Sequence, residues 1–463
     1  MRRVLTLTTL LVVVLAPPAV AGTRLYIKGR GYGHGVGMSQ YGAQGYALHG
    51  WGYAAILRHY YQGTALGQVN PSTRIRVQLA SPSSLTLAHM DRANKTKLNP
   101  SKTYVMRRSG ARLQLLTSAG KSLGRYHPTT FRGYHGYFYL GNRQLNGHGP
   151  GDYRGTLSVT ATSSGVSAVN VVSLDDYARA VVPSEVPTSW DPDALRVQAV
   201  AARTYALTTG VGHTLYPDTR SQMYSGMSVE TPATSAAVKA TRGQVVTYHG
   251  APIVTYYFST SGGRTENVEN VFGGSPEPYL RSVEDRYDSI APLHKWTKRM
   301  SLSSAGSELR GLYSGSLRTI KVLERGKSPR IVRARVVGSR GSSVTDGSTL
   351  RSRLSAYDSW MYFYLVTAKG TKPAAVGAAV HGAAGAGTVP ERISRTRLRG
   401  LAGSVRGAPR GARAKIQRLR HGRWTAADRV PLGRGGTVRW TAPQAGTYRV
   451  TWGGMPSDAV ALR

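Results

Sequence analysis

The stretch VVSLDDYARAVVPSEVPTSWDPDALRVQAVAARTYAL, from Val171 to Leu207, carries the strongest structural signals in the chain. Asp191 suits the N-cap of a helix and Pro192 suits the first helical position, so we expect a helix to begin here. The segment from Asp193 to Leu207 is apolar on nearly all sides, which is typical of a helix buried in a core. This stretch therefore predicts a domain built around one buried helix.

Glu185 precedes that helix and lies between Pro183 and Pro187. Proline lacks a backbone N–H and disfavours helical conformation in the residue before it, so we expect Glu185 in a short, stiff, extended turn. A carboxyl on a rigid turn at the mouth of a buried helix is a candidate general acid. From these residues alone, a surface glutamate near a helix start remains an alternative.

Two further segments are rich in Gly and Tyr, and the second of them contains a Ser-Gly-Gly turn. They are GRGYGHGVGMSQYGAQGYALHGWGYAAILRHYYQGT, from Gly29 to Thr64, and TYYFSTSGGRTENVENVFGGSPEPYLRSVED, from Thr255 to Asp285. With VVPSEVPTSW and DALRVQAVAARTYAL, they resemble the stage II sporulation protein D and amidase-enhancer family of bacterial cell-wall proteins. The resemblance covers most of the chain up to about Ala368.

The order of the segments differs from the family's usual order. GYGHGVGMSQ usually comes last, after a segment resembling Thr345 to Val366, whereas here it comes first. The difference indicates a circular permutation, which compact domains with neighbouring termini tolerate. The strand expected at Arg24–Lys28 should then lie beside the strand expected around Met361–Val366.

The resemblance implies one of two activities. The first is that of a lytic transglycosylase, in which one carboxyl protonates the bond between N-acetylmuramic acid and N-acetylglucosamine and then activates the muramic C6 hydroxyl. The second is a non-catalytic enhancement of a cell-wall amidase. The catalytic role would fall on Glu185, whose pKa the apolar Val182, Val186 and Trp190 are expected to raise. A structural wall adhesin is a third interpretation.

A glycoside hydrolase would need a second carboxylate in the cleft. Asp175 and Asp176 are expected to cap a helix at 177–182, while Glu266 and Glu269 are candidates for orienting substrate. No spacing among them compels a catalytic role, so a mechanism with a single Glu is favoured.

Substrate contacts are expected from side chains in the three segments and the SQMYSG turn. The predicted substrate-binding residues are His34, Ser39, Gln40, Arg203, Gln222, Tyr224, Ser259, Thr260, Ser261 and Gly262. Glycines beside His34 would let the backbone approach a ligand. Gln198 and Arg203, polar residues on a buried helix, would either face the cleft or satisfy nearby carbonyls. His213 occupies the region where some family members bind zinc, but the chain has no Cys, so no metal and no cofactor are expected.

Residues 1–21 have the pattern of a secretory signal peptide, with Arg2 and Arg3, an apolar run and a final Ala-Val-Ala. The chain also has a net charge of +39, from 61 Lys and Arg against 22 Asp and Glu. An exported protein of this charge is expected to meet anionic wall polymers and peptidoglycan rather than nucleic acid. We therefore expect a secreted, cell-wall-associated protein.

Three parts are expected after the signal peptide. The first is an α+β, β-rich catalytic domain at 22–368, which includes a β lobe at about 73–172. An Ala/Gly-rich linker at 369–389 and a small β-sandwich at 390–463 come after it. Residues 391–463 hold 16 Lys and Arg against 3 Asp and Glu, a balance of +13.

Overall fold

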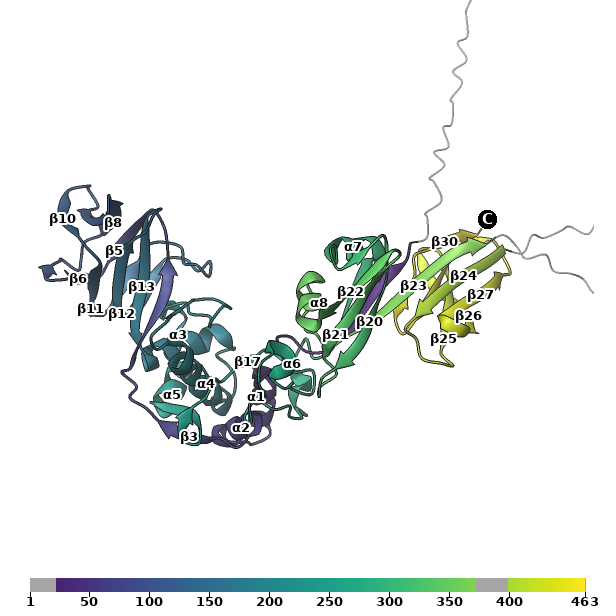
Figure 1. Cartoon of the computed structure of the whole chain (residues 1–463), viewed down its shortest axis with the longest axis horizontal. Coiled ribbons are helices and arrows are strands. Elements are labelled where there is room, and N and C mark those ends of the chain that lie inside the picture. The colour runs from purple at the N-terminus through teal and green to yellow at the C-terminus, as the bar shows by residue number, and fades with distance from the viewer. Residues whose placement is uncertain (1–21, 372–398, 463) are drawn as a thin grey trace, which may run out of the picture.

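The computed structural model describes residues 22–371 and 399–462. The predicted signal peptide and most of the predicted linker lie outside the described residues. The fold is a mixed, strand-rich α+β structure, which confirms the expected class at that level. In Figure 1 a β lobe lies at one end, the helices lie in the middle, and further sheets lie at the other end. Within the described ranges, no helix combines the length and apolar character that a bilayer span requires.

The β lobe is one large, mainly antiparallel sheet. Its strands in sheet order are β10 (Ser122–Tyr126), β9 (Arg112–Thr117), β8 (Tyr104–Ser109), β5 (Ser84–Ala88), β11 (Thr129–Leu140), β12 (Gly151–Ala161), β13 (Val166–Ser173), β4 (Arg74–Ala80) and β14 (Thr214–Leu215), with β6 (Met90–Ala93) and β7 (Thr96–Lys97) beside β11. Side chains alternate along β4, where Ile75, Val77 and Leu79 are fully buried. This alternation is what the sequence predicted for the segment IRVQL.

The middle of the molecule is built around helix α4 (Pro192–Gly210). Asp191 caps it as expected, because its Oδ1 accepts a hydrogen bond from the Asp193 N–H at 2.8 Å. Around α4 pack α1 (Gln40–Leu48), α2 (Tyr53–Tyr60), α3 (Leu174–Glu185), α5 (Pro232–Ala240) and the strand β15 (Gln244–Tyr248), which pairs with β3 (Ala65–Gln68) and β16 (Ala251–Pro252). Twelve of its residues are buried, so the sequence prediction of a buried helix is confirmed.

The local structure around Glu185 differs from the expectation. Pro183 lies inside helix α3, and Glu185 is the last residue of that helix rather than part of an extended turn. The proline removes one backbone hydrogen bond, but the Val186 N–H still bonds to the Val182 carbonyl at 3.1 Å and closes the last turn. Val182 is fully buried in a cluster with α4 and α5, and this packing outweighs the local preference of proline.

The start of α3 also differs from the expectation. Ser173 is the N-cap, since its Oγ accepts a hydrogen bond from the Asp176 N–H, and the Asp176 carboxylate accepts one from the Ser173 hydroxyl. Asp176 thus takes part in the cap, whereas Asp175 pairs with Arg203.

The first strand, β1 (Arg24–Gly29), lies between β18 (Trp296–Ser301) and β23 (Met361–Thr371). Arg24 is opposite Val366 and Lys28 is opposite Tyr362 in an antiparallel register. The predicted pairing of these two distant segments is confirmed. The permutation itself stays our interpretation of the segment order.

The sheet that holds β1 contains strands from both sides of the predicted linker. β23 pairs on its other edge with β24 (Arg399–Arg406), which pairs with β27 (Thr437–Ala442). A second sheet faces it and contains β26 (Arg423–Pro431), β25 (Arg413–Arg420), β28 (Gly446–Trp452), β29 (Met455–Pro456) and β30 (Val460–Leu462). Tyr26 and Val366 share one core with Ile416 and Val450, so segments on both sides of the linker are packed together.

A four-stranded sheet joins this end to the helices (Figure 1). It consists of β19 (Tyr313–Ser314), β22 (Gly341–Asp346), β21 (Ile331–Gly338) and β20 (Leu317–Arg325), with α7 (Leu302–Glu308) and α8 (Gly347–Arg353) packed beside it. Three short elements complete the connection to the first motif. The strand β2 (Met38–Ser39) pairs with β17 (Tyr257–Phe258), and α6 (Glu269–Phe272) comes after β17 in the chain.

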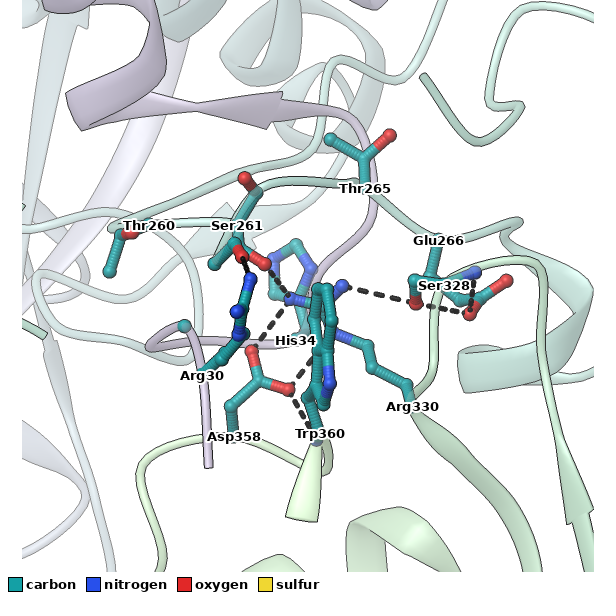
Figure 2. Close-up of polar contacts among 12 residues, drawn as sticks. Arg30, His34, Thr260, Ser261, Thr265, Glu266, Ser328, Arg330, Asp358 and Trp360 are labelled. Atoms are coloured by element: carbon teal, nitrogen blue, oxygen red, sulfur yellow. Dashed lines mark hydrogen bonds and ion pairs between the residues drawn. The ribbon is translucent and has the colours of Figure 1, made fainter. Parts of the chain in front are cut away.

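A buried ion pair between Arg330 and Asp358 anchors the glycine-rich segment (Figure 2). The two Arg330–carboxylate bonds measure 2.9 and 2.8 Å, and both side chains are excluded from solvent. Gly35 has a positive φ, and a Cβ there would overlap the Arg330 guanidinium; a Cβ on Gly31 would lie 2.7 Å from Asp358 Oδ2. Gly31 and Gly35 thus allow the backbone to approach a buried ion pair closely.

We predict that Arg330→Met lowers the free energy of unfolding by about 3–5 kcal/mol, because it leaves the Asp358 carboxylate buried without its partner. Arg333→Met is the matched control, since Arg333 is 59% exposed and its nearest carboxylate, on Glu324, is 3.7 Å away. The control should lose less than about 1 kcal/mol. Equal losses in urea unfolding of the two variants would contradict the anchoring role.

Candidate functional site

A cavity of about 500 Å³ brings together parts of all three motif segments. Its lining residues are Tyr32, Gly33, His34, Gln40, Glu185, Tyr205, Thr219, Arg220, Ser221, Gln222, Tyr256, Tyr257, Phe258, Ser259, Phe272 and Arg351. Five of the residues predicted from the sequence are among them: Glu185, His34, Gln40, Gln222 and Ser259. Glu185 is the single acidic residue of the lining, so any acid–base chemistry by a carboxyl in this cavity falls on it.

The Glu185 carboxyl is partly exposed to the cavity and otherwise enclosed by protein. Its Oε1 accepts a hydrogen bond of 2.7 Å from the Met223 N–H, while the Gln40 amide is 3.5 Å from Oε2. Burial raises the pKa of Glu185 above the ordinary carboxyl value, and hydrogen bonds from Met223, Tyr257 and Gln40 partly offset this rise. A carboxyl with a raised pKa at a cavity surface can donate a proton and take it back.

Tyrosines and glutamines surround the carboxyl. Tyr257 receives a 2.8 Å hydrogen bond from the Gln222 side-chain amide, and the nearby charge of Glu185 adds to the burial that raises the pKa of the Tyr257 hydroxyl. In the described part of the chain, the buried Tyr177 hydroxyl, Gln198 Nε2 and Gln222 Oε1 have no hydrogen-bond partner. Buried polar atoms are usually paired, and of these three residues Gln222 lines the cavity.

His34 lies in the wall of the cavity, but both of its ring nitrogens are engaged. Nδ1 accepts a hydrogen bond from the Val36 N–H, so Nε2 carries the proton and donates to the Tyr257 carbonyl at 3.1 Å. Burial, together with the charge of Arg351, lowers the pKa of His34 to about 3. The imidazole is therefore neutral with a fixed tautomer, which suits it to support Tyr257 rather than to move protons.

Four predicted residues surround a buried carboxylate instead of the cavity. Asp288 accepts hydrogen bonds from the hydroxyls of Ser39 and Thr260 and from the backbone N–H groups of Ser261 and Gly262. Figure 2 shows Thr260 and Ser261 beside the Arg330 cluster, to which the Ser261 carbonyl contributes an acceptor. The Ser-Gly-Gly turn thus binds a carboxylate of the protein itself, and these four residues line no part of the Glu185 cavity.

Arg203 and Tyr224 also lie outside the cavity lining. Arg203 is fully buried, bonds to Asp175 at 2.6 Å and donates to the Gln244 carbonyl, which fits the alternative that it satisfies nearby groups. The Tyr224 hydroxyl donates to the Asn170 side chain at 2.6 Å within the core of the β lobe. Arg203 thus connects α4 to Asp175 and Gln244, and Tyr224 connects the SQMYSG turn to Asn170 in the β lobe.

The candidate second carboxylates all have structural partners. Glu266 is fully buried and accepts hydrogen bonds from the backbone of Lys327 and from Ser328, and Glu269 pairs with Arg281 at 2.9 Å. Neither lines the Glu185 cavity, so neither is placed to orient substrate there. No group of three or more His, Asp or Glu side chains able to hold a metal occurs within the described residues.

Several cavity residues were not predicted from the sequence. Tyr257 and Tyr256 lie in the quoted TYYF segment, and their aromatic character was the available signal. Arg220, which pairs with Asp218, and Arg351 also line the cavity, and Arg351 comes from α8, outside the three quoted motif segments. Such a residue enters the site only through the packing of α8 beside the first segment.

Near the site, a second buried acid predicts a pH dependence of stability. Burial, followed by the charge of Asp288, raises the pKa of Asp285 to about 7. The unfolded value is near 3.9, so the folded state binds the proton more tightly, and stability falls as pH rises from about 4 through 7. Asp285→Asn should therefore be more stable than the wild type at pH 8, by about 4 kcal/mol, since the pKa shift is about three units and one unit corresponds to about 1.4 kcal/mol.

At pH 4 the same substitution should change little, because Asp285 is then neutral and Asn can still accept the hydrogen bond from the Tyr60 hydroxyl. Glu308→Gln, at an exposed carboxylate, is the control and should change unfolding by less than about 0.5 kcal/mol at either pH. Urea titrations at the two pH values give the comparison. A pH-independent difference between Asp285→Asn and the wild type would refute the titration of this carboxyl.

Comparison with known proteins finds one family model and several relatives that match part of the chain. The family model described as stage II sporulation protein matches residues 162–248, which include Glu185. Over 217 residues the chain is 31% identical to stage II sporulation protein D of Bacillus subtilis (strain 168), covering 42% of this chain and 60% of that protein. It is 42% identical to the amidase enhancer of the same strain over 125 residues, which cover 27% of this chain and 17% of the enhancer.

An uncharacterised protein of Brachyspira hyodysenteriae is 32% identical over 164 residues, which cover 34% of this chain and 44% of that protein. The chain thus spans less than two thirds of the length of each of these relatives. The matched segments include α3 and α4, the helices that carry Glu185 and the core beneath it. On these matches, residues 162–248 carry the sequence pattern of the stage II sporulation protein model, and the chain is similar to proteins named stage II sporulation protein D and amidase enhancer.

Proposed function

We propose that this protein is an exported, wall-associated lytic transglycosylase that cleaves the glycan strands of peptidoglycan with Glu185 as its single acid and base. The observation that carries the proposal is that Glu185 is the one carboxyl in a cavity of about 500 Å³ and has a raised pKa. Relatives named for sporulation and for amidase enhancement support a role at the cell envelope. Peptidoglycan is the polymer that fits both names.

The proposed reaction needs one carboxyl and no water. Glu185 in its acid form protonates the glycosidic oxygen between N-acetylmuramic acid and N-acetylglucosamine, and the bond to the muramic anomeric carbon breaks. The muramic C6 hydroxyl attacks that carbon and gives its proton to the Glu185 carboxylate, which restores the acid. The product is a 1,6-anhydromuramyl end, and atoms balance because the proton that leaves Glu185 is replaced by the hydroxyl proton.

The hydrogen bonds of Glu185 support different roles for its two carboxyl oxygens. The Met223 N–H binds Oε1 closely at 2.7 Å, whereas the Gln40 amide is 3.5 Å from Oε2. Oε2 is therefore the oxygen suited to carry the proton toward substrate. Tyr256, Phe258 and Phe272 form an aromatic wall on which a sugar ring can lie.

The second candidate function is a non-catalytic enhancer of an N-acetylmuramoyl-L-alanine amidase. It is favoured by the 42% identity to the amidase enhancer, although that match covers 17% of the enhancer. In this function the cavity would bind glycan and present it to a partner enzyme, and Glu185 would supply contacts but no proton. The two functions differ in the products formed by the isolated protein.

We predict that Glu185→Gln lowers the release of anhydromuramyl products from purified glycan strands by about 10²–10⁴-fold, the usual contribution of a general acid–base group. Glu308→Gln, which removes an exposed carboxylate, should release products at the wild-type rate. Mass spectrometry of the products is the measurement. Reducing ends instead of anhydro ends would indicate hydrolysis and contradict the proposed reaction.

If the protein is an enhancer instead, the same assay should give a different result. The wild-type protein alone would then release no glycan products, yet it would accelerate peptide release by an added amidase. Glu185→Gln would accelerate that release equally well, provided that circular dichroism shows an unchanged fold. This result would replace the transglycosylase proposal with the enhancer function.

The basic C-terminal part supports a further proposal, that it retains the protein on anionic wall polymers. Arg420 and Arg423 lie opposite each other in the β25–β26 hairpin, and both are exposed. Because β24 completes a sheet with β23, deletion of residues 391–463 would disturb the fold. Exchange of surface charges tests retention without that damage.

We predict that Arg420→Glu combined with Arg423→Glu weakens pull-down by whole cell walls, and that wall binding falls as salt rises, since the Debye length is about 10 Å at 0.1 M. The control, Lys102→Glu with Lys121→Glu, changes the same charge on exposed residues of the β lobe. Cleavage of short soluble glycans should be unchanged in both. Equal loss of wall binding in the two double variants would indicate a general charge effect and contradict retention by the C-terminal part.

A further inference from the structure

A second cavity, of about 440 Å³, lies on the sheet formed by β18, β1 and β23. Its lining residues are Lys28, Gly29, Arg30, Lys295, Trp296, Thr297, Tyr362 and Tyr364. It shares no lining residue with the Glu185 cavity, and its lining contains three cations and no acidic residue. A cavity of this composition has a net positive charge that nothing in its own wall neutralises.

The three cations converge from two strands and the segments beside them. Lys28 on β1 is held by a 2.9 Å hydrogen bond from its Nζ to the Gly453 carbonyl, in the turn between β28 and β29. The Arg30 guanidinium lies 5.5 Å from the centre of the Trp360 ring, and Lys295 is exposed at the rim. None of these cations forms an ion pair with a carboxylate in the described parts of the chain.

Aromatic rings in fixed orientations form the rest of the wall. The Tyr362 ring is 39% exposed, and the Arg325 guanidinium lies 4.4 Å from its centre. Tyr364 packs on Trp452 with ring centres 5.4 Å apart, and the Trp296 indole donates a 2.8 Å hydrogen bond to the Gly31 carbonyl. Rigid aromatic surface beside a few polar groups is the usual composition of a site for a ring-shaped polar ligand.

We propose that this cavity binds an acidic saccharide, with a sugar ring against Tyr362 and Tyr364 and its carboxylate or phosphate held by Lys28, Arg30 and Lys295. The cations surround one cavity instead of forming the extended basic track that a single-stranded nucleic acid needs. The Gly453 carbonyl orients the Lys28 side chain at this cavity. The site is independent of cleavage at Glu185.

The test is isothermal titration of the full-length protein with defined oligosaccharides. A tetragalacturonate supplies ring carboxylates, a phosphorylated tetrasaccharide supplies ring phosphates, and chitotetraose supplies neutral rings. One or both acidic ligands should bind at least about tenfold more tightly than the neutral one, because a charge-assisted hydrogen bond is worth that factor or more. The tighter of the two identifies the anion.

Variants locate the site. Lys295→Glu and Tyr362→Ala should each weaken binding of the acidic tetrasaccharide by about tenfold, while Tyr362→Phe retains the ring and the affinity. Lys121→Glu makes the same charge change on the exposed β lobe and should stay within about twofold of the wild type. Glu185→Gln should bind normally, which keeps this result separate from the proposed cleavage.

Three outcomes would overturn the proposal. The first is equal weakening by Lys295→Glu and Lys121→Glu, which would mean attraction by net charge alone. The second is undiminished binding by Tyr362→Ala, which would exclude ring contact. The third is binding of a short oligothymidylate as tight as that of the acidic tetrasaccharide, which would make the cavity part of a nucleic-acid surface. Thermal unfolding of each variant verifies that the fold is intact.

Discussion

The buried guanidinium of Arg330 is the contact on which the middle of this structure depends. Its Nε and Nη2 bind Asp358, and its remaining N–H groups donate to Ser328 Oγ and to the carbonyls of Arg264 and Ser261. A buried charge is tolerated only when it is paired and fully hydrogen-bonded. This requirement fixes together the turn after β17, the segment before β21 and the segment before β23. The glycine-rich start of the chain then packs directly against the pair.

Because the glycine-rich segment is fixed against this ion pair, the residues that follow it lie at the candidate active site. Beyond Gly35 the chain forms β2 and α1, and α1 places Gln40 at 3.5 Å from the Glu185 carboxyl, 145 residues away in the sequence. Glu185 itself depends on α3, which continues past Pro183 because its apolar face packs on α4 and α5. The proposed chemistry thus rests on a carboxyl presented by the end of one helix and bounded by the start of another.

Raised carboxyl pKa values occur at two places, and their surroundings separate their roles. Glu185 and Asp285 both gain a raised pKa through burial. Asp285 accepts the Tyr60 hydroxyl deep in the core, whereas Glu185 lines a cavity with unpaired polar atoms around it. Access, and not the direction of the pKa shift, therefore distinguishes the candidate catalytic acid from a carboxyl buried in the core.

Features that depend on neighbouring residues could be predicted from the sequence alone. The Asp191 cap, the buried character of α4 and the alternation in β4 result from local chemistry, and the segment order predicted the pairing of β1 with β23. Tertiary packing was needed to carry α3 through Pro183, to direct Thr260 to Asp288 and to bring Arg351 to the cavity. The physical reason is range: caps and periodicity act within a few residues, whereas cavity membership and burial of charge depend on contacts between segments far apart in the sequence.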